Sequence, residues 1–565
     1  MSTSSKNSQP NVMDIAIIGG GVSGAYTAYR LLKTAPNESS VLSRLLKGKE
    51  QLDVRLFERT PSIGGRLWSY HFPDIPNQVA ELGGHAFYEV QQNVYGLCTK
   101  ELGLEIIPAP SYFDSHIQYL RRHHFNSDQY VPEDRPPNYY PDVIPYFLKD
   151  TEKWQFPSTL VQNALEESVP GTKALTQEIL TAIEANDWTT ALKGINALTA
   201  CLREAKIGDQ PIYECGFWNH LANKLSIEAY EMASKFIAPA SPNRNLNLYD
   251  GFVLYWVMFV LSFTKQAHFV RLRQGYQTLP EEMIKRFVES GGTRLLRQEL
   301  YSLQTECHNC EQLIALTVGT PGTSERQVFY ARYVVLAMPQ RALQRLDQDS
   351  FIFQNAQFVA DINTIMGVPS SKLYLTYDKP WWKSIPYGPS KILDNKITAG
   401  NSITDLPLQT CYYFTGEKDG KSLLMATANE NPVTEFWSGY LPGSCFTPVD
   451  WPLCAPTQMV TEAQRQLKEM HDYDIPEPLE AIYRNWTQEP YGGGWHLWKP
   501  HLRSWEVIPR IRQPVPESHV FLCGEAYSAQ QGWVEGAINN AEVMLETHFG
   551  LPRPDWVNGD YDFGP

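Results

Sequence analysis

A glycine-rich turn near the start of the chain constrains the fold more than any other feature. Asp14–Ile18 is a short apolar run of the kind that forms a strand buried on both faces. Gly19, Gly21 and Gly24 then match the pattern GxGxxG, and the helix-forming stretch Ala25–Leu32 follows. Such glycines let the backbone approach a pyrophosphate seated at the helix N-terminus. We therefore predict a dinucleotide-binding, Rossmann-like α/β domain rather than a tight turn without a ligand.

The next expected strand ends in an acid that can hold a ribose hydroxyl. Asp53–Phe57 has the pattern of a strand, and Glu58 follows it. Glu58 comes later than the usual spacing of about 20 residues, and the polar stretch Pro36–Gln51 explains the delay as an insertion. A second glycine turn, Gly64–Arg66, offers N–H groups and a cation for a diphosphate. NAD sites have little use for this second turn, so it favours FAD.

Composition limits the class of protein. The chain has 565 residues, of which 43% are hydrophobic, so two or three globular domains are expected. The net charge of −14 disfavours nucleic acid or an anionic membrane as a partner. The first eleven residues lack the apolar core of a signal peptide, and the apolar stretch 251–261 is too short to cross a bilayer. We therefore expect a cytoplasmic protein.

The nine cysteines do not suggest a disulfide framework. Their odd number indicates free thiols in a reducing compartment. Cys307 and Cys310 have the spacing of metal ligands, but no second such pair lies nearby in the sequence. We interpret this stretch as a polar turn between two strands and predict no metal site.

Further motifs occur in a fixed order along the chain. They are Glu81–Gly84, Val335–Pro339, and the pair Gly524 and Glu525 that follows the apolar run Val520–Cys523. Together with the two glycine turns, these motifs resemble those of the FAD-dependent amine oxidases, a family that includes monoamine, polyamine and L-amino acid oxidases. The resemblance covers nearly the whole chain, which makes it far more specific than any one motif.

The resemblance implies an α/β (α+β) architecture in three parts: a Rossmann-like FAD-binding domain built from discontinuous segments, a β-sheet substrate domain and a helical insertion. The stretch 171–203 has helical spacing, and Ser371–Tyr377 alternates as a strand of the substrate sheet would. The expected segments are 12–71, 265–350 and 480–550 for the FAD-binding domain, 72–120 and 351–479 for the substrate domain, and 121–264 for the helical domain.

The resemblance also implies how FAD is held. Glu525 would accept a hydrogen bond from a ribityl hydroxyl, and the helix that begins at Val534 would direct its positive dipole end at the flavin. Leu300 matches a strand position whose backbone contacts adenine. Binding would be non-covalent, because Trp495 stands where some relatives attach the flavin through a cysteine. The expected cofactor residues are Gly19, Gly21, Val22, Ser23, Gly24, Glu58, Arg59, Gly65, Arg66, Gly83, Gly84, Leu300, Gly524, Glu525, Trp533 and Val534.

Aromatic side chains are expected to orient the substrate at the flavin. Trp533 and Trp495 match family positions for the two sides of an aromatic slot, and the carbonyl of Gly532 can accept a hydrogen bond from the substrate amine. The sequence SITDLP, followed by Tyr412 and Tyr413, resembles the L-amino acid oxidase branch, in which a tyrosine helps bind the substrate carboxylate. Alternate strand positions face opposite ways, so one of the two tyrosines would face the substrate. We expect Tyr413, with Tyr412 as the alternative.

One position departs from the amino acid oxidase pattern. Those enzymes usually carry an arginine that grips the substrate carboxylate bidentately, and Ala86 stands in its place. Either another cation holds the carboxylate, or the substrate is not a free α-amino acid. Arg345 lies near the family's lysine that holds a water by flavin N5, so it is a candidate for either role. His85 is a candidate donor.

Three functions are consistent with these residues. The first, which we favour, is an L-amino acid oxidase that forms a 2-oxo acid, ammonia and H2O2 by hydride transfer to flavin N5 and reoxidation by O2. The second is an amine or polyamine oxidase without a carboxylate site, and the third is a flavin-binding protein without oxidase turnover. The expected partners are a small amino acid or amine and O2, and a homodimer is one assembly that the sequence leaves open.

Overall fold

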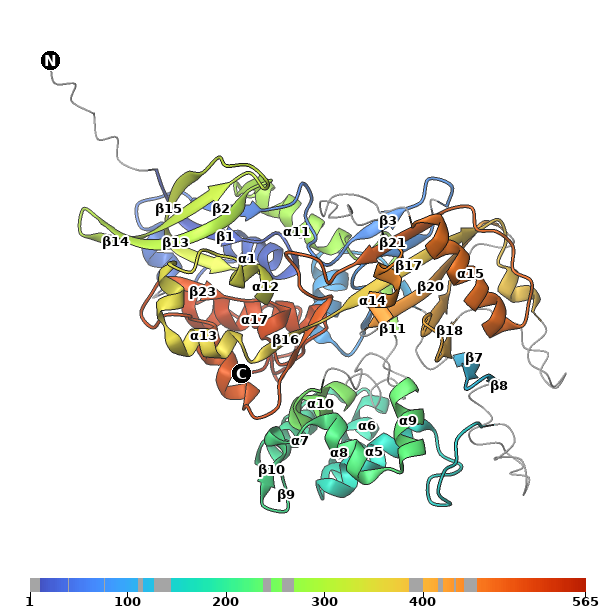
Figure 1. The fold of residues 1–565 in the computed structure, drawn as a ribbon. Helices are drawn as coiled ribbons and strands as arrows, with labels where there is room; N and C mark the ends of the chain where they lie inside the picture. Colours follow the sequence, from blue (N-terminus) through green and yellow to red (C-terminus); the bar gives the residue numbers. More distant parts are fainter. Residues whose placement is uncertain are drawn as a thin grey trace.

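The computed structural model describes residues 11–38, 40–75, 77–109, 115–125, 144–236, 245–256, 269–385, 400–414, 420–430, 433–441 and 455–565. Two lobes that contain β-sheets lie side by side, and a helical lobe lies below them (Figure 1). Segments from both ends of the chain, blue and red in Figure 1, share the first lobe. The expected α/β class with a helical insertion is confirmed.

A seven-stranded sheet forms the centre of the first lobe, in the order β12-β2-β1-β15-β14-β13, with β23 paired to β15. Neighbours from β12 to β15 run parallel, as does β23 beside β15, whereas β13, β14 and β15 run antiparallel. The strand bounds are Val12–Ile18 (β1), Val54–Glu58 (β2), Thr293–Leu296 (β12), Glu299–His308 (β13), Glu311–Gly319 (β14), Gln327–Leu336 (β15) and Val520–Leu522 (β23). The strands expected at both ends of the chain thus meet on β15.

Helices cover both faces of this sheet. On β1, Ile15 and Ile17 pack in one buried cluster with α1 (Val22–Lys33), α11 (Thr278–Glu289) and α17 (Val534–Met544). Ala16 and Ile18 pack on the other face, in a cluster that includes α13 (Ala356–Ile362) and α16 (Ser504–Ile511). The apolar run of β1 is therefore buried on both sides, as its sequence predicts.

The second lobe holds another seven-stranded sheet, in the order β21-β17-β20-β19-β18-β7-β8. One face packs against α15 (Thr457–His471), and the other packs against the hairpin of β3 (Ser69–His71) and β4 (Val79–Glu81). The strand bounds are Ala481–Asn485 (β21), Ser370–Tyr377 (β17), Ser422–Glu430 (β20), Thr410–Tyr413 (β19), Gly400–Thr404 (β18), Ser115–Leu120 (β7) and His123–Phe125 (β8).

The helical lobe is built around one apolar cluster. The expected helical stretch 171–203 forms two helices because Asp187 caps the second by accepting a hydrogen bond from the Thr190 N–H at 3.1 Å. The helices are α5 (Pro157–Ser168), α6 (Thr172–Glu184), α7 (Trp188–Glu204), α8 (Phe217–Lys224), α9 (Ile227–Phe236) and α10 (Leu248–Tyr255). None of the helices in the described ranges is long and apolar enough to cross a membrane.

Several elements lie outside the lobes in which the sequence places them. Strand β8, expected in the helical domain, pairs with β7 in the second sheet. Helix α13, expected in the substrate domain, packs in the core of the first lobe. Strand β21, expected in the FAD-binding domain, pairs with β17 in the second sheet. The boundaries of the expected division beside β8, α13 and β21 are therefore corrected.

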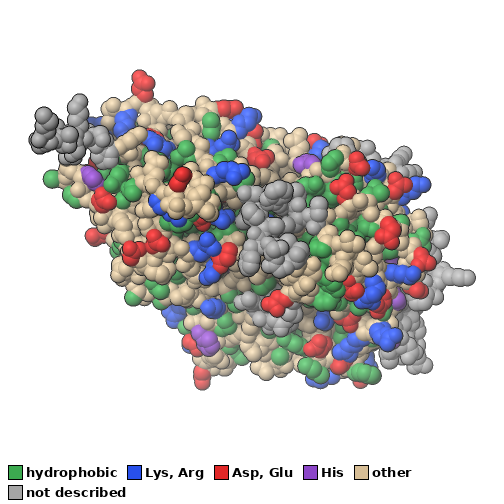
Figure 2. All heavy atoms as spheres, turned by 45° about the horizontal axis from the view of Figure 1, so that its top comes forward, with side chains coloured by type: hydrophobic (Ala, Val, Ile, Leu, Met, Phe, Trp, Pro, Cys, Tyr) green, Lys and Arg blue, Asp and Glu red, His purple; other side chains and the backbone are tan. Residues whose placement is uncertain are grey.

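Other expectations concern the surface. Cys307, near the end of β13, and Cys310, in the turn to β14, are exposed, free cysteines, which confirms the predicted polar turn between two strands. Figure 2 shows acidic and basic side chains interspersed over one face, without a large field of one sign among the described side chains.

Candidate active site

The first glycine turn leaves open space where a ligand can lie. Gly19 has a φ of +113°, and a Cβ there would collide with the carbonyl oxygen of Ala337. A Cβ on Gly24 would collide with the carbonyl oxygen of Gly19, so glycine lets α1 start against the turn. A Cβ on Gly21, in contrast, would meet only the Cα of Gly65, at 4.0 Å. Gly21 therefore borders a cavity.

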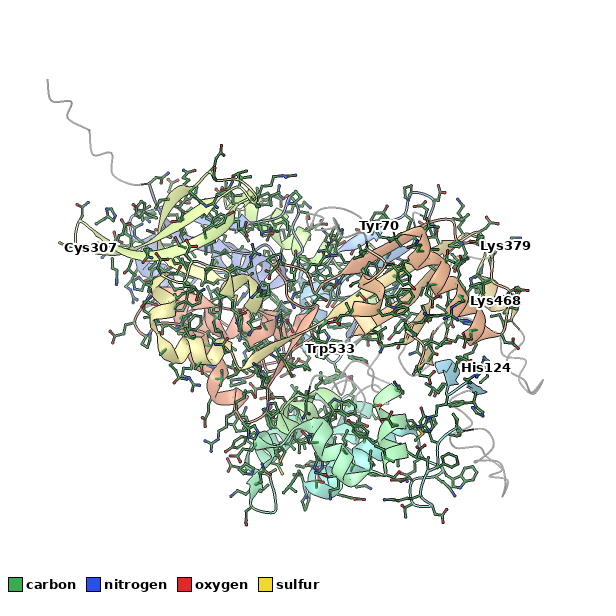
Figure 3. All side chains as sticks on the ribbon, viewed as in Figure 1. Tyr70, His124, Cys307, Lys379, Lys468 and Trp533 are labelled. Atoms are coloured by element: carbon green, nitrogen blue, oxygen red, sulfur yellow. The ribbon has the colours of Figure 1, made fainter. Side chains whose placement is uncertain are left out.

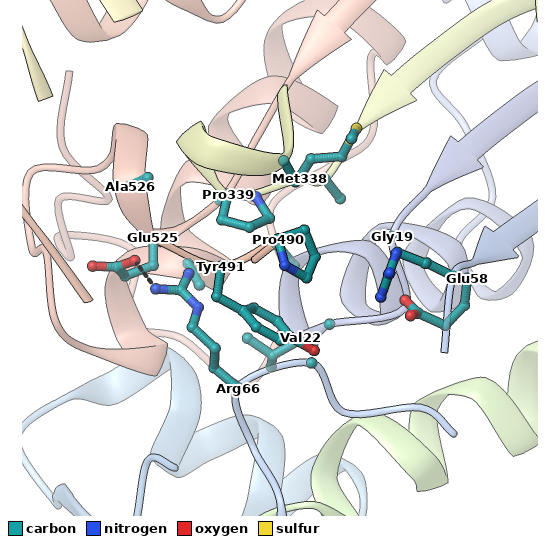
Figure 4. Close-up of a pocket in the computed structure, with 18 of the residues that line it drawn as sticks. Gly19, Val22, Glu58, Arg66, Met338, Pro339, Pro490, Tyr491, Glu525 and Ala526 are labelled. Carbon is teal, nitrogen blue, oxygen red and sulfur yellow. Dashed lines mark ion pairs between the residues drawn. The ribbon is translucent and has the colours of Figure 1, made fainter. Parts of the chain in front are cut away.

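This cofactor cavity, of about 210 Å³, is lined by segments from both ends of the chain (Figure 4). Glycine turns from both ends reach it, with Gly19 and Gly524 on its wall, and Arg66 and Tyr491 close it from other segments. All the expected cofactor residues line it except Gly24, within α1, and Gly83, which lines a second cavity. The structure thus brings together residues that are about 500 positions apart.

Glu58, at the end of β2, is buried beside the glycine turn. Its Oε2 accepts a hydrogen bond from the Gly20 N–H at 2.5 Å, and its Oε1 accepts from the N–H and Oγ of Thr60, each at 2.7 Å. Burial raises the pKa of Glu58, and these donors oppose the rise. A carboxylate accepts about four hydrogen bonds, so one position remains for a ribose hydroxyl.

Glu525, in the turn that follows β23, contacts three residues: His496, Gly532 and Arg66. Its Oε1 accepts from the N–H groups of His496 and Gly532, at 2.9 and 2.8 Å. Its Oε2 lies 2.8 Å from Nδ1 of His496 and 2.8 Å from the guanidinium of Arg66, a pair drawn in Figure 4. Burial alone would raise the pKa of Glu525, but Arg66 and His496 hold it well below its usual range.

The same contacts use the acceptor positions of Glu525. Four donors reach a carboxylate that can accept about four hydrogen bonds. In this structure Glu525 therefore fixes the last turn against Arg66, and its contact with a ribityl hydroxyl stays a prediction.

Arg345 lies on the rim of the cofactor cavity. Its guanidinium pairs with Glu489 at 2.9 Å and lies 3.7 Å from Glu299. It is 39% exposed and is not among the residues that line the second cavity. The structure therefore does not support Arg345 as the group that binds a substrate carboxylate or holds a water at the reacting centre.

A second cavity of about 210 Å³ adjoins the first. Seven residues line both cavities, and we call this shared wall the seam. The shared residues are Arg66, Gly84, Gly494, Trp495, Gly532, Trp533 and Val534. Val534 is also the first residue of α17, so the N-terminus of this helix lies at the seam.

Gly532 allows the ring of Trp495 to pack closely against the backbone that precedes Trp533, so both tryptophans border the seam. Gly532 has a φ of +84°, and a Cβ there would come 2.8 Å from the ring of Trp495. The ring of Trp533 packs against Tyr88, with ring centroids 5.5 Å apart. The three residues that the sequence places in an aromatic slot therefore do border one cavity.

Strand β19 turns the two candidate tyrosines in opposite directions. Tyr412 lines the second cavity. Tyr413 is fully buried on the other face, where its hydroxyl donates to Oγ of Ser402 at 2.7 Å and lies 2.5 Å from Nε2 of His471. The structure therefore favours Tyr412, the alternative to Tyr413, because β19 directs Tyr413 to the face of the sheet that packs against α15.

Lys372 is a residue of the second cavity that the sequence motifs do not reveal. It lies on β17, and its Nζ donates to the carbonyl oxygens of Gly83 at 2.5 Å and Glu81 at 3.1 Å. Nδ1 of His85 lies 3.3 Å away, and burial together with Lys372 lowers the pKa of His85 well below its usual range. The available signal was a lone lysine in an otherwise uncharged strand. His85 lines the same cavity and is neutral there.

The chain matches the model of the family described as flavin-containing amine oxidoreductases over residues 27–542. The protein belongs to this family. The match begins within α1, just after the first glycine turn, and runs through the second sheet and the helical lobe to most of α17. The family resemblance inferred from the motifs is therefore confirmed.

Known relatives of this flavin-containing amine oxidoreductase are distant in sequence. Aplysianin-A of Aplysia kurodai is 24% identical over 95% of the chain and 90% of its own length. Achacin of Lissachatina fulica is 23% identical over 95% of the chain and 93% of its own length. A tryptophan 2-monooxygenase of Allorhizobium ampelinum is 22% identical over 93% of the chain and 67% of its own length.

Solved structures share the fold of the protein. A redesigned putrescine oxidase matches with a TM-score of 0.60 at 16% identity, over 94% of this chain and 98% of that chain. Cyclohexylamine oxidase of Brevibacterium oxydans matches with the same TM-score and identity, over 95% and 99%.

FAD is the cofactor of this family member. The space beside Gly21 admits a diphosphate, Glu58 retains an acceptor position for a ribose, and the helix N-terminus at Val534 faces the seam. Trp495 offers no thiol for a covalent link, which is consistent with non-covalent binding.

Proposed function

We propose that the protein is an L-amino acid oxidase that forms a 2-oxo acid, ammonia and H2O2. When bound, FAD accepts a hydride from the substrate Cα and returns the electrons to O2. The chain's own residues bind the amino acid, orient its Cα and exclude water. The seam, where Trp495, Gly532 and Trp533 border both cavities, supports an amine-oxidising site. The observation that carries the choice of an amino acid is Lys372 in the second cavity.

Gly532 and the two tryptophans orient the amine in this proposal. The carbonyl of Gly532 accepts a hydrogen bond from the amine, and the aromatic rings leave a narrow, apolar approach that favours a neutral amine over its hydrated cation. Both rings are large and rigid, so they hold the reacting carbon in place at little entropic cost.

The substrate carboxylate needs a positive group in the second cavity. Ala86 lines this cavity and cannot provide one, whereas Lys372 and Tyr412 line it as well. We propose that the ammonium of Lys372 and the hydroxyl of Tyr412 stabilise the carboxylate. A charged hydrogen bond of this kind contributes about 1.5–3 kcal/mol.

An oxidase of simple amines is the second candidate, and Ala86 favours it. The names of the relatives divide in the same way, between a tryptophan monooxygenase and oxidases of putrescine and cyclohexylamine. A substrate without a carboxylate needs no positive side chain at position 86, and the aromatic residues of the seam can orient its amine equally well.

Peroxide release from the purified yellow protein separates the candidates. We would measure it with the twenty L-amino acids, a set of monoamines and a set of polyamines. Turnover of amino acids alone supports the proposal, and turnover of amines alone supports the second candidate. Bound FAD without turnover of any compound would contradict both and leave a flavoprotein without oxidase activity.

A further inference from the structure

A third, small cavity lies between helix α10 and the first lobe. Its volume of about 20 Å³ admits one group of the size of water or an ammonium. Its walls are apolar on most sides, where Leu246, Leu497 and Trp498 are almost fully buried. Asp250 is the acidic residue among those that line it.

Asp250 presents a carboxylate oxygen that has no partner among the described residues. The side chain is 9% exposed, and its Oδ1 accepts a hydrogen bond from Oγ of Ser504 at 2.7 Å. Its Oδ2 is buried and receives no hydrogen bond. Such an oxygen costs free energy unless a donor or a cation reaches it.

The position of Asp250 in its helix does not account for this oxygen. Asp250 is the third residue of α10, where an acid interacts favourably with the helix dipole. The cap itself is provided by Asn247, whose Oδ1 accepts a hydrogen bond from the Asp250 N–H at 3.1 Å. An exposed acid would satisfy the dipole without the cost of burial.

The third cavity adjoins the substrate cavity. Leu254, Gln531 and Trp533 line both of them. Leu254 follows Asp250 by four residues on α10, which corresponds to about 6 Å along the helix and to the same face. Figure 3 shows the labelled Trp533 where the three lobes approach one another.

We propose that Asp250 binds the distal ammonium of a substrate that carries two amino groups, while its reacting amine lies beside Trp533. The proposal rests on the proposed function and adds the substrate class, which is a dibasic amino acid or a linear diamine. An uncharged chain end would leave the Oδ2 of Asp250 unpaired in apolar surroundings, so the site discriminates by charge rather than by size.

Two nearby groups set the charge at this site. Burial raises the pKa of Asp250 to about 7, and the hydroxyl of Ser504 and the guanidinium of Arg203 oppose the rise. Arg203 lies over the ring of Trp505, with its Cζ 5.7 Å from the centroid. A bound ammonium favours the ionised carboxylate, so preference for the charged substrate should increase as the pH rises through about 7.

Two matched substrate pairs test the proposal on the purified holoprotein. The pairs are L-lysine with L-norleucine, and 1,5-diaminopentane with pentylamine, which differ in the distal ammonium. We expect the wild type to prefer the charged member of the pair that it oxidises. Asp250→Asn should lower kcat/KM for that member about tenfold or more, mainly through KM, and change the neutral member by less than about twofold.

Two control variants separate binding from a structural role. Asp187→Asn replaces another acid of the helical lobe at a helix cap, where asparagine is an equally good cap, and should change neither substrate. Ser504→Ala removes the hydroxyl on Oδ1 but keeps the charge, so the preference for the charged substrate should persist. Equal losses on both members with Asp250→Asn, or no preference in the wild type, would overturn the proposal.

Failure of the proposed function has a different signature. Turnover of norleucine or pentylamine without a preference for their charged partners overturns the role of Asp250 alone. If no compound is oxidised, thermal shift with L-lysine and L-norleucine still measures binding. A shift with lysine in the wild type that Asp250→Asn abolishes supports the site, and equal shifts in both proteins oppose it.

Discussion

Glycine at position 19 is required for two reasons, which a matched variant separates. Its φ of +113° disfavours other residues, and a Cβ would also collide with Ala337. Gly48 has a φ of +80°, but a Cβ at this position would have no atom within 4 Å, so Gly48→Ala should cost about 1 kcal/mol of stability and retain FAD. Gly19→Ala should instead lose FAD, measured as flavin absorbance per protein. Full flavin content in Gly19→Ala would contradict the assignment.

The carboxylate of Glu525 should stabilise the protein in a pH-dependent manner. Glu525→Gln removes the charge that Arg66 and His496 face, which should cost about 1–3 kcal/mol near neutral pH. Because the folded-state pKa of Glu525 is depressed, its contribution is complete above the unfolded pKa of about 4.3 and is lost as the pH falls below it. Thermal midpoints of both proteins should differ at pH 7 and converge in acid. A constant difference would argue against the charge.

Some residues of the site could be read from the sequence and others could not. Gly19, Glu58 and Glu525 lie at the end of a strand or within three residues after it, so local order places them at the carboxyl edge of the sheet. Lys372 could not be chosen in this way, because its partners Glu81 and Gly83 are about 290 residues away and on another element. Arg345 carries the right charge for a carboxylate, and its pairing with Glu489 is visible only in the fold.

Strand β19 provides a test of which tyrosine serves the substrate. Tyr412→Phe should raise KM for an amino acid about tenfold and leave the thermal midpoint nearly unchanged, because one hydrogen bond to a charged group contributes about 1.5–3 kcal/mol. Tyr413→Phe should lower the thermal midpoint and leave KM nearly unchanged, since the Tyr413 hydroxyl contacts Ser402 and His471 in the core. Steady-state kinetics and thermal unfolding of the two variants measure this. An increase in KM with Tyr413→Phe alone would contradict the role of Tyr412.

The elements themselves were more predictable than their grouping. Apolar runs and glycine turns gave β1, β23 and the hairpin at Cys307 because each depends on local sequence. The placement of α13 and β21 depends on which distant surface each one covers. Alternation along a strand also leaves open which set of residues faces which side of the sheet. For β19 this depends on packing against α15, which comes later in the chain.

Distant segments of the chain line the cavity that we assign to FAD, and Trp495 offers no thiol for a covalent link. Acid precipitation should therefore unfold the protein and release FAD into the supernatant. Flavin absorbance in the pellet and the supernatant measures this, and colour retained in the washed pellet would contradict non-covalent binding. Free FAD at about 100 times its Kd should stabilise the folded protein by about 2.7 kcal/mol.

The pairing of β23 with β15 has a consequence for synthesis. β15 ends at Leu336 and β23 begins at Val520, an interval that a ribosome translates in roughly 10 to 40 s at about 5–20 residues per second. During that time the nascent chain has a sheet with an open edge, and Gly524 and Glu525 have not yet been made. Loading with FAD must therefore wait until translation is nearly finished. A prematurely terminated chain would leave one edge of β15 open at Val334–Leu336, where another chain could pair.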